Sequence, residues 1–371
     1  MQHRFLKHKT LLFSAVAASV LCAGFFGWGI GVLAQSPAPV PIKLRVMTHS
    51  SFELPKPLLV RFEQEAGVQL QLIQGGDAGE LLNKLILSQA APVADVVYGI
   101  DNSLLPRALA SGILAPFPTA AGSAALRPAQ ARMAESAGPT GVVGGLVPIN
   151  YGYVNLNIDT AWFAQKGLAL PQSLQDLSRP AYRGLLVVPH PATSSPGQAF
   201  MLATVAGLGE QAAFEWWARM RTNGVKVVKG WSEAYYTEFS RNGGSRPIVV
   251  SYATSPAAEV FFSQEKVSTS PTANLFLPGG VFRQVEAAAL LQKASPAAQA
   301  AGVKFIEFLR SPEVQLALQT SLWMYPAEPG TPRHAVMQHA QEPLQFETMP
   351  LRQLTAQAAL WQRRWTQVVL K

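Results

Sequence analysis

From residue 42 onward, short apolar stretches alternate with amphipathic ones, and this alternation restricts the possible folds more than any other feature. Residues 42–48 and 68–73 have the composition of strands, whereas residues 79–90 carry a leucine and isoleucine stripe at helical spacing. Strands that alternate with helices predict a largely parallel sheet with helices on both faces. The chain is therefore expected to be an α/β protein.

The length and two extended stretches predict two lobes. The chain has 371 residues, which is more than one compact core normally holds. Residues 146–158 are long enough to cross between lobes, and residues 280–290 can carry the chain back. The last helix places Trp361 and Trp365 on one apolar stripe, which is typical of a buried face.

The N-terminal segment predicts export. Arg4, Lys7 and Lys9 precede an uncharged apolar run over residues 11–34. This arrangement is typical of a secretory signal, but about 20 apolar residues also suffice to span a bilayer. A cleaved signal and an uncleaved anchor both fit, and either places the folded part outside the cytoplasm. Cys22 is the one cysteine and lies in this segment, so the exported part has no disulfide and no thiolate chemistry.

Charge and motifs exclude several classes of function. The formal charge is +8, but the basic side chains are scattered and no Lys/Arg cluster is interleaved with aromatics, so we expect no nucleic-acid partner. HExxH, GxSxG, the P-loop and GxGxxG after a strand are missing from the sequence. Its histidines lack metal-ligand spacing, and its carboxylates form no pair suited to acid–base work. We therefore expect no enzyme activity, no catalytic residue and no metal site.

Two hydroxyl-rich turns precede helices that begin with proline, at residues 193–197 and 254–256. In the first turn, Ser195 is predicted to be the N-cap and Pro196 the first helical residue. A helix start presents free N–H groups and a partial positive charge, which suit an anionic or hydrogen-bond-accepting ligand group. Each turn also fits a plain helix cap.

Three aromatic residues lie at the ends of predicted elements and outside any helical stripe: Trp231, Tyr252 and Trp323. Aromatic faces suit a flat cationic ligand, through attraction of about 0.5–2 kcal/mol each, although core packing is the alternative. Asp77 and Asp101 each follow a predicted strand, at the edge where open α/β sheets bind ligands. Either aspartate also fits an N-cap.

The sequence resembles the periplasmic thiamine-binding proteins of ABC transporters, from about residue 44 to the last helix. The most specific block is KGWSEAY at residues 229–235, and the other matching blocks are residues 94–105, 151–153, 193–197, 250–257 and 323–326. The resemblance implies a two-lobed periplasmic binding protein fold of type II, in which each lobe is a sheet flanked by helices with a hinge between them. It also implies a periplasmic monomer that delivers its ligand to the permease and ATPase subunits of the transporter.

The expected domain organisation follows from the pattern and the resemblance together. It comprises a signal peptide or anchor (1–34), a Pro-rich spacer (35–41), lobe 1 (42–148, with about 281–320 returning to it), lobe 2 (149–280) and a C-terminal helical segment of unassigned lobe (321–371).

The resemblance also implies a ligand site. The positions that match ligand contacts of the family are Asp77, Ala78, Ser194, Ser195, Trp231, Tyr252, Ala253, Thr254, Ser255, Pro256 and Trp323. Asp77 is expected to orient the aminopyrimidine or to offset the positive charge. The ligand implied by the resemblance is thiamine, thiamine monophosphate or thiamine diphosphate, and no separate cofactor is expected. Three positions depart from the family pattern: His49 replaces a tyrosine, Asn150 an aspartate and Ala78 a glycine.

Other functions fit parts of the sequence. The same fold binds ferric iron, polyamines or phosphonates, and Tyr235-Tyr236 superficially matches the adjacent tyrosines of iron sites. Tyr235 lies within KGWSEAY, however, so a packing role is expected for it. A thiamine-degrading enzyme on this scaffold needs a cysteine nucleophile, which the exported part lacks. A receptor or adhesin component without a small ligand is a third class.

Overall fold

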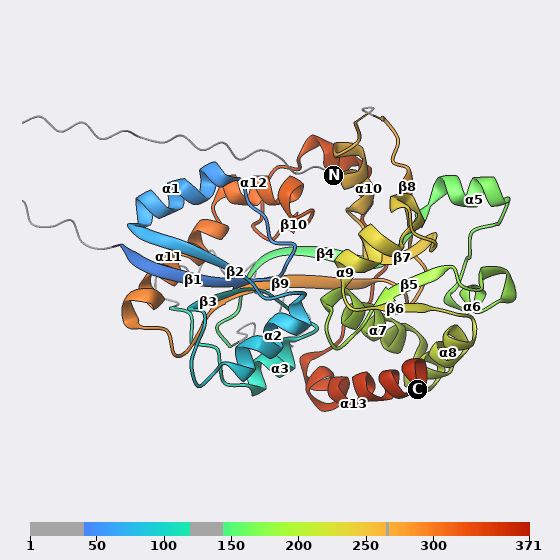
Figure 1. Ribbon diagram of the computed structural model, residues 1–371, viewed down its shortest axis with the longest axis horizontal. Helices are drawn as coiled ribbons and strands as arrows, with labels where there is room; N and C mark the ends of the chain where they lie inside the picture. The colour runs from blue at the N-terminus through green and yellow to red at the C-terminus, as the bar shows by residue number, and fades with distance from the viewer. Residues whose placement is uncertain (1–40, 119–143, 265–266) are drawn as a thin grey trace, which may run out of the picture. The chain divides into compact units, whose positions relative to one another are not determined.

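The computed structural model describes residues 41–118, 144–264 and 267–371 (Figure 1). The predicted signal or anchor, nearly all of the spacer and most of the connection expected at residues 116–145 lie outside the described residues. No helix within the described ranges is long and apolar enough to cross a membrane.

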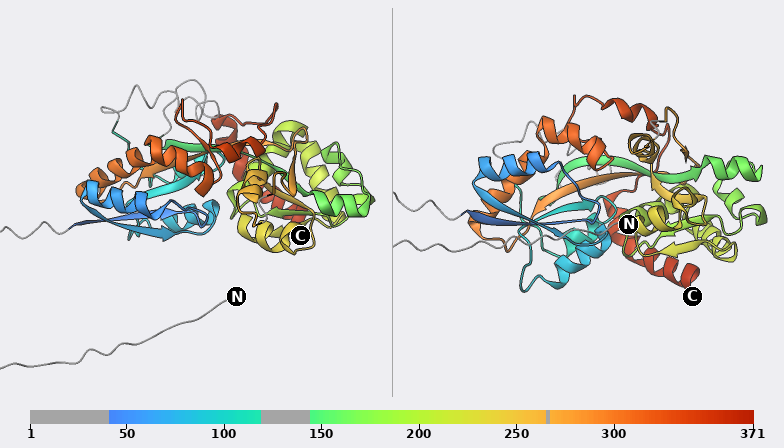
Figure 2. Two further views of the ribbon diagram at one scale, coloured as in Figure 1. Left: turned by 90° about the horizontal axis from the view of Figure 1, so that it is seen from above. Right: turned by 45° about the horizontal axis from the view of Figure 1, so that its top comes forward.

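One long strand, β4 (Val147–Asp159), belongs to both halves of a ten-stranded sheet. Its first half pairs with β9 (Phe282–Leu290) and β10 (Tyr325–Pro326). Its second half pairs with β7 (Ile248–Tyr252) and β8 (Thr272–Leu275). Figure 2 shows β4 (green) and β9 (orange) side by side as they pass from one group of helices to the other.

The remaining strands extend the two halves. We call the half with β1 (Ile42–Thr48), β2 (Val68–Gln74) and β3 (Val96–Asp101) the first lobe, and the half with β5 (Leu186–Pro189), β6 (Lys226–Val228), β7 and β8 the second lobe. The pairs β1–β2, β1–β3, β5–β6 and β5–β7 are parallel.

The prediction of a largely parallel sheet is wrong for the centre, where β4 and β9 pair with other strands of the described residues only in the antiparallel sense. The physical reason is that the chain leaves the first lobe on β4 and returns beside it on β9, so the two strands must run in opposite directions. The two-lobed α/β fold is confirmed.

Helices cover both faces of the first lobe, as the apolar patterns require. Leu44 and Val46 of β1 pack toward α1 and α11, while Met47, on the opposite face, packs toward α2 and α3. The helices of this lobe are α1 (Lys56–Ala66), α2 (Ala78–Leu87), α3 (Leu105–Ala110), α11 (Pro296–Leu309) and α12 (Pro312–Ser321).

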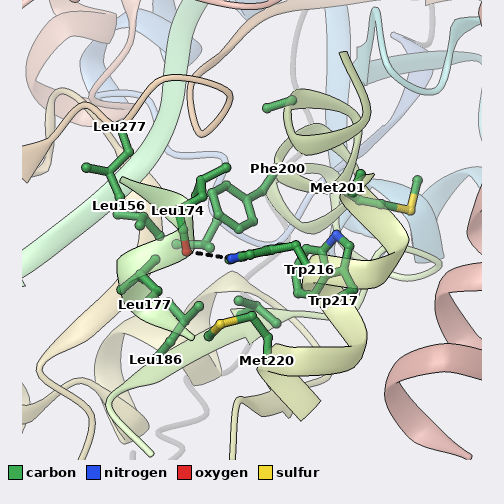
Figure 3. Close-up of a cluster of buried hydrophobic side chains, with 14 of the residues drawn as sticks. Leu156, Leu174, Leu177, Leu186, Phe200, Met201, Trp216, Trp217, Met220 and Leu277 are labelled. Carbon is green, nitrogen blue, oxygen red and sulfur yellow. Dashed lines mark hydrogen bonds between the residues drawn. The ribbon is translucent and has the colours of Figure 1, made fainter. Parts of the chain in front are cut away.

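Tryptophans dominate the core of the second lobe (Figure 3). Trp216 and Trp217 on α8 are fully buried, and their indole N–H groups donate to the Leu174 carbonyl (2.5 Å) and the Thr204 hydroxyl (3.0 Å). The C-terminal helix α13 packs on α8 and adds Trp361 and Trp365 to this core. The remaining helical elements are α5 (Thr160–Lys166), α6 (Leu174–Leu177), η1 (Pro180–Tyr182), α7 (Ser195–Leu208), α8 (Glu210–Thr222), α9 (Trp231–Glu233), η2 (Ala234–Glu238), η3 (Ser240–Asn242), α10 (Ser255–Phe261), η4 (Ala335–His339) and α13 (Leu351–Leu370).

Candidate ligand-binding site

A cavity of about 1210 Å³ is lined by both lobes. The first lobe contributes the loop after β1 and the start of α2, and the second lobe contributes α9, α10 and the end of β7. The start of α7, the segment after α10, the crossing strand β9 and the segment after α12 also contribute to the wall. Several wall residues follow the carboxyl ends of strands, which is where open α/β sheets bind ligands.

Eight of the eleven predicted site residues line this cavity, and three do not. The lining residues among them are Asp77, Ala78, Ser195, Trp231, Tyr252, Thr254, Ser255 and Trp323. Ser194, Ala253 and Pro256 are buried next to lining residues but are not part of the wall. Residues that lie far apart in the sequence therefore meet at one site. That each of them contacts a ligand stays a prediction.

Both carboxylate oxygens of Asp77 already have partners. Oδ1 accepts a hydrogen bond from the Ala78 amide at 2.8 Å and caps α2, and Oδ2 accepts one from the Trp231 amide at 3.0 Å. Nearby, the Lys229 ammonium lies 3.1 Å from the Glu80 carboxylate. Asp77 thus joins the two lobes at the edge of the cavity, and it can meet a ligand only by sharing or exchanging these bonds.

Trp231 is fixed in orientation by its neighbours. Its indole N–H donates to the Ser251 hydroxyl at 2.8 Å, and its ring stacks on Tyr235 with centroids 5.2 Å apart. The Tyr252 ring meets it edge-on at 6.2 Å. Because these contacts hold the ring in place before a ligand arrives, little side-chain entropy remains to be lost on binding.

Trp323 has a strained backbone. Its φ of 57° is positive, which no other non-glycine residue shows in the described part of the chain. The Thr254 hydroxyl donates to its carbonyl at 2.5 Å, and Phe261 and Phe262 meet its ring edge-on at 5.3 and 5.5 Å. A conformation of this kind costs on the order of 1–3 kcal/mol and persists only where surrounding contacts impose it, often at a ligand site.

Helix α7 begins one residue earlier than expected, with Ser194 as the N-cap and Ser195 as the first helical residue. The prediction of Ser195 as the N-cap is wrong because proline is tolerated throughout the first turn, whose N–H groups have no helical partner. Both serine hydroxyls are buried, and neither has a hydrogen-bond partner among the described residues. The helix start therefore retains unused donors beside the cavity.

Asp101 is not part of the cavity wall. Its Oδ1 accepts hydrogen bonds from the Ser103 amide (2.7 Å) and the Ser103 hydroxyl (2.6 Å), so it organises the turn before α3. Burial raises the pKa of this carboxyl to about 7, against the opposing effect of the bonds from Ser103.

Sequence reasoning missed an acidic residue in the wall, Glu286 on β9. Its Oε2 accepts a hydrogen bond from the Tyr98 hydroxyl at 2.9 Å, and its Oε1 lies 3.7 Å from His49 Nε2. No helical or metal-binding pattern marks this residue. The available signal was that Glu286 is the one charged residue in the apolar run VEAAALL at residues 285–291, since buried acids are rare unless they are paired.

The pKa shifts of this pair favour the ionised forms. Burial is the largest single effect and lowers the pKa of His49, but the carboxylates of Glu286, Asp77 and Asp101 together raise it above its ordinary value. Burial likewise raises the pKa of Glu286, yet the charge of His49 and hydrogen bonds from Tyr98 and Asn150 leave that pKa lowered. Below the raised pKa of His49, the cavity therefore contains a buried ion pair.

Two lobes joined by crossing strands, with a shared cavity between them, define a type II periplasmic binding protein. The sequence matches the family described as bacterial extracellular solute-binding protein over residues 91–349, and the chain belongs to this family.

Relatives with described functions fall into two groups. The thiamine-binding periplasmic protein of Escherichia coli (strain K12) is 31% identical over 90% of this chain and 95% of that protein. The protein of the same description from Brucella melitensis is 28% identical over 87% of this chain and 91% of that protein. Iron uptake protein A1 of Synechocystis is 24% identical over 74% and 73% of the two chains.

Solved structures confirm the fold. A periplasmic thiamin binding protein matches with a TM-score of 0.74 and 30% identity, over 90% of this chain and 98% of that one. The ferric binding protein from Campylobacter jejuni matches with a TM-score of 0.69 and 17% identity, over 88% and 99%. At that identity the second match shows the fold alone.

Proposed function

We propose that this chain is the solute-binding component of an ABC importer, and that it captures thiamine or a thiamine phosphate in the cavity. The observation that carries the proposal is that Trp231, Tyr252 and Trp323 meet around one cavity that also contains carboxylates. The relatives described as thiamine-binding, similar over about nine-tenths of both chains, support the same ligand.

The chemistry of the ligand explains this wall. Thiamine carries a fixed thiazolium charge that deprotonation cannot remove, so a cavity that dehydrates it must supply carboxylates or aromatic faces in return. Trp231, Tyr252 and Trp323 would contact the rings. Ser195 and the N–H groups at the start of α7 would bind the hydroxyethyl or phosphate end.

The transport step follows from the two lobes. Closure of the lobes about the crossing strands β4 and β9 would bury the ligand, and the closed form would then dock on the permease, with its ATPase subunits, in the membrane. In this proposal residues 1–34 direct export, and the folded part acts in the periplasm as a monomer. It uses no cofactor, binds no nucleic acid and catalyses no reaction.

The experiment is calorimetric titration of the purified protein with thiamine, thiamine monophosphate and thiamine diphosphate, together with native mass spectrometry. We expect one molecule bound per chain for at least one of the three. Ferric citrate is the comparison ligand, because iron on tyrosinate would give a visible charge-transfer band. Absence of binding by all three thiamine compounds would contradict the proposal.

A further inference from the structure

We propose that Glu286 is the carboxylate that receives the positive charge of the ligand, and that His49 is an internal cation whose proton the ligand drives into solvent. This inference rests on the proposed function. It assigns the selectivity for a permanently charged ligand to a pair of residues in the wall of the cavity.

Glu286 is held in place by hydrogen bonds and lines the cavity. Only 6% of this residue is exposed, yet it lines the cavity. The Tyr98 hydroxyl donates to Oε2 at 2.9 Å and the Gln284 amide donates to Oε1 at 3.3 Å. These bonds fix the carboxylate and support its ionised form, so its charge is present before any ligand arrives.

His49 supplies the positive charge that a buried carboxylate requires. Its Nε2 lies 3.7 Å from Glu286 Oε1, which is too far for a hydrogen bond, and it has no hydrogen-bond partner in the described ranges. The imidazole is confined by Gly99, where an added Cβ would lie 2.5 Å from the His49 ring. His49 is therefore held next to the carboxylate by position and charge, and Nε2 can lose its proton without breaking a hydrogen bond.

The ionisable surroundings of His49 are acidic on every side. Glu286 faces it from β9, Asp77 from the start of α2 and Asp101 from the end of β3, and as carboxylates all three raise its pKa despite burial. Burial raises the pKa of Asp101 to about 7, so at pH 6 this group is largely protonated, whereas Glu286, whose pKa is lowered, keeps its charge. The Tyr98 ring lies 5.4 Å away and is uncharged, because burial raises the pKa of its hydroxyl well above the ordinary value. Below the raised pKa of His49, the free protein thus holds the proton on this residue.

A permanent cation changes this balance. When the thiazolium enters, two cations compete for Glu286, and only His49 can become neutral. The proton passes from Nε2 to solvent, no bond of the ligand breaks, and the net charge of the site is unchanged. A neutral molecule of the same shape cannot displace the proton, so the pair discriminates by charge.

The test is calorimetric titration with thiamine in buffers of different ionisation enthalpy, at about pH 6, where His49 holds its proton in the free protein. We expect about one proton released per thiamine bound. The affinity should rise up to tenfold per pH unit as the pH rises toward the pKa of His49 in the free protein, and should then level off, because one proton is displaced.

Two variants separate the roles. His49→Gln should bind thiamine without proton release, and its affinity should not depend on pH through His49. Glu286→Gln should bind at least about tenfold more weakly, with its fold checked by circular dichroism. His339→Gln is the matched control, since His339 does not line the cavity, and it should release the proton as the wild type does. Protonation of thiamine itself is common to all of these proteins and cancels in the comparison.

An uncharged thiamine analogue, with carbon in place of the thiazolium nitrogen, completes the design and should release no proton. Proton release that persists in His49→Gln, or thiamine binding by the wild type without proton release, would overturn the inference and leave the proposed function intact. Failure of the wild type to bind thiamine, thiamine monophosphate and thiamine diphosphate under all conditions would instead refute the proposed function.

Discussion

The tryptophans of the second-lobe core and those of the cavity occupy opposite kinds of position. Trp217 and Trp365 lie on helix faces at the spacing of a buried stripe, with ring centroids 5.3 Å apart and no appreciable exposure. Trp231 and Trp323 lie where elements begin or end, and each lines the cavity. A tryptophan thus packs in the core where helical spacing places it on a buried face. It is available for ligand binding where it lies at the end of an element.

The largest effect that distinguishes the two regions is expected in the core. Trp217→Ala removes a fully buried ring and its hydrogen bond to Thr204, which should lower the free energy of unfolding by about 3–5 kcal/mol. Denaturant unfolding measures this value. The folded fraction should bind thiamine as the wild type does, since the ring is not part of the cavity wall. A free energy of unfolding equal to that of the wild type would contradict the packing role of Trp217.

In the cavity, Trp231→Ala should reduce the affinity for thiamine more than it reduces stability. Loss of the ring face should weaken thiamine binding at least tenfold, or about 1.4 kcal/mol, as measured by calorimetry, with a smaller loss of stability than in Trp217→Ala. Trp231→Phe is the matched control because it keeps a smaller aromatic face while losing the bond to Ser251. Unchanged affinity in Trp231→Ala would remove this residue from the site.

Asp77→Ala tests the acidic edge of the same cavity. It removes the cap of α2 and the acceptor for the Trp231 amide, and thiamine binding should again weaken at least tenfold, or about 1.4 kcal/mol. Asp77→Asn retains an oxygen that can cap α2 and should bind more tightly than Asp77→Ala. Calorimetry that finds wild-type affinity in Asp77→Ala would contradict the assigned role.

The smallest effect is expected for the ion pair between Lys229 of the second lobe and Glu80 of the first lobe. Lys229 is 66% exposed, and exposed pairs contribute about 0–1 kcal/mol. Lys229→Ala should therefore change the affinity for thiamine less than about threefold. A loss of affinity as large as that expected for Asp77→Ala would show that the Lys229–Glu80 ion pair between the lobes, and not the aromatic wall, controls binding.

Local sequence patterns predicted what depends on local chemistry. The apolar periods located most strands and helices, and the break in periodicity at Trp231 and Trp323 separated them from the packed stripe of α13. The hydroxyl-rich turns before helices indicated Ser195 and Thr254, and the resemblance added Ala78; all three line the cavity.

What the patterns did not show depends on contacts between distant segments. The two short strands β8 and β10 were missed because they exist only through pairing with β4. Glu286 and His49 are 237 positions apart, and no local pattern predicts that β9 carries the acid to the loop after β1. The ion pair was therefore visible only after the fold had brought these residues together.

The most direct test of the account is a crystal structure of the protein with thiamine bound. We expect the ligand rings to lie against Trp231, Tyr252 and Trp323, with the thiazolium closer to Glu286 than to any other carboxylate. Thiamine bound outside this cavity, or with its charged ring turned away from both Glu286 and the aromatic faces, would contradict the central claim.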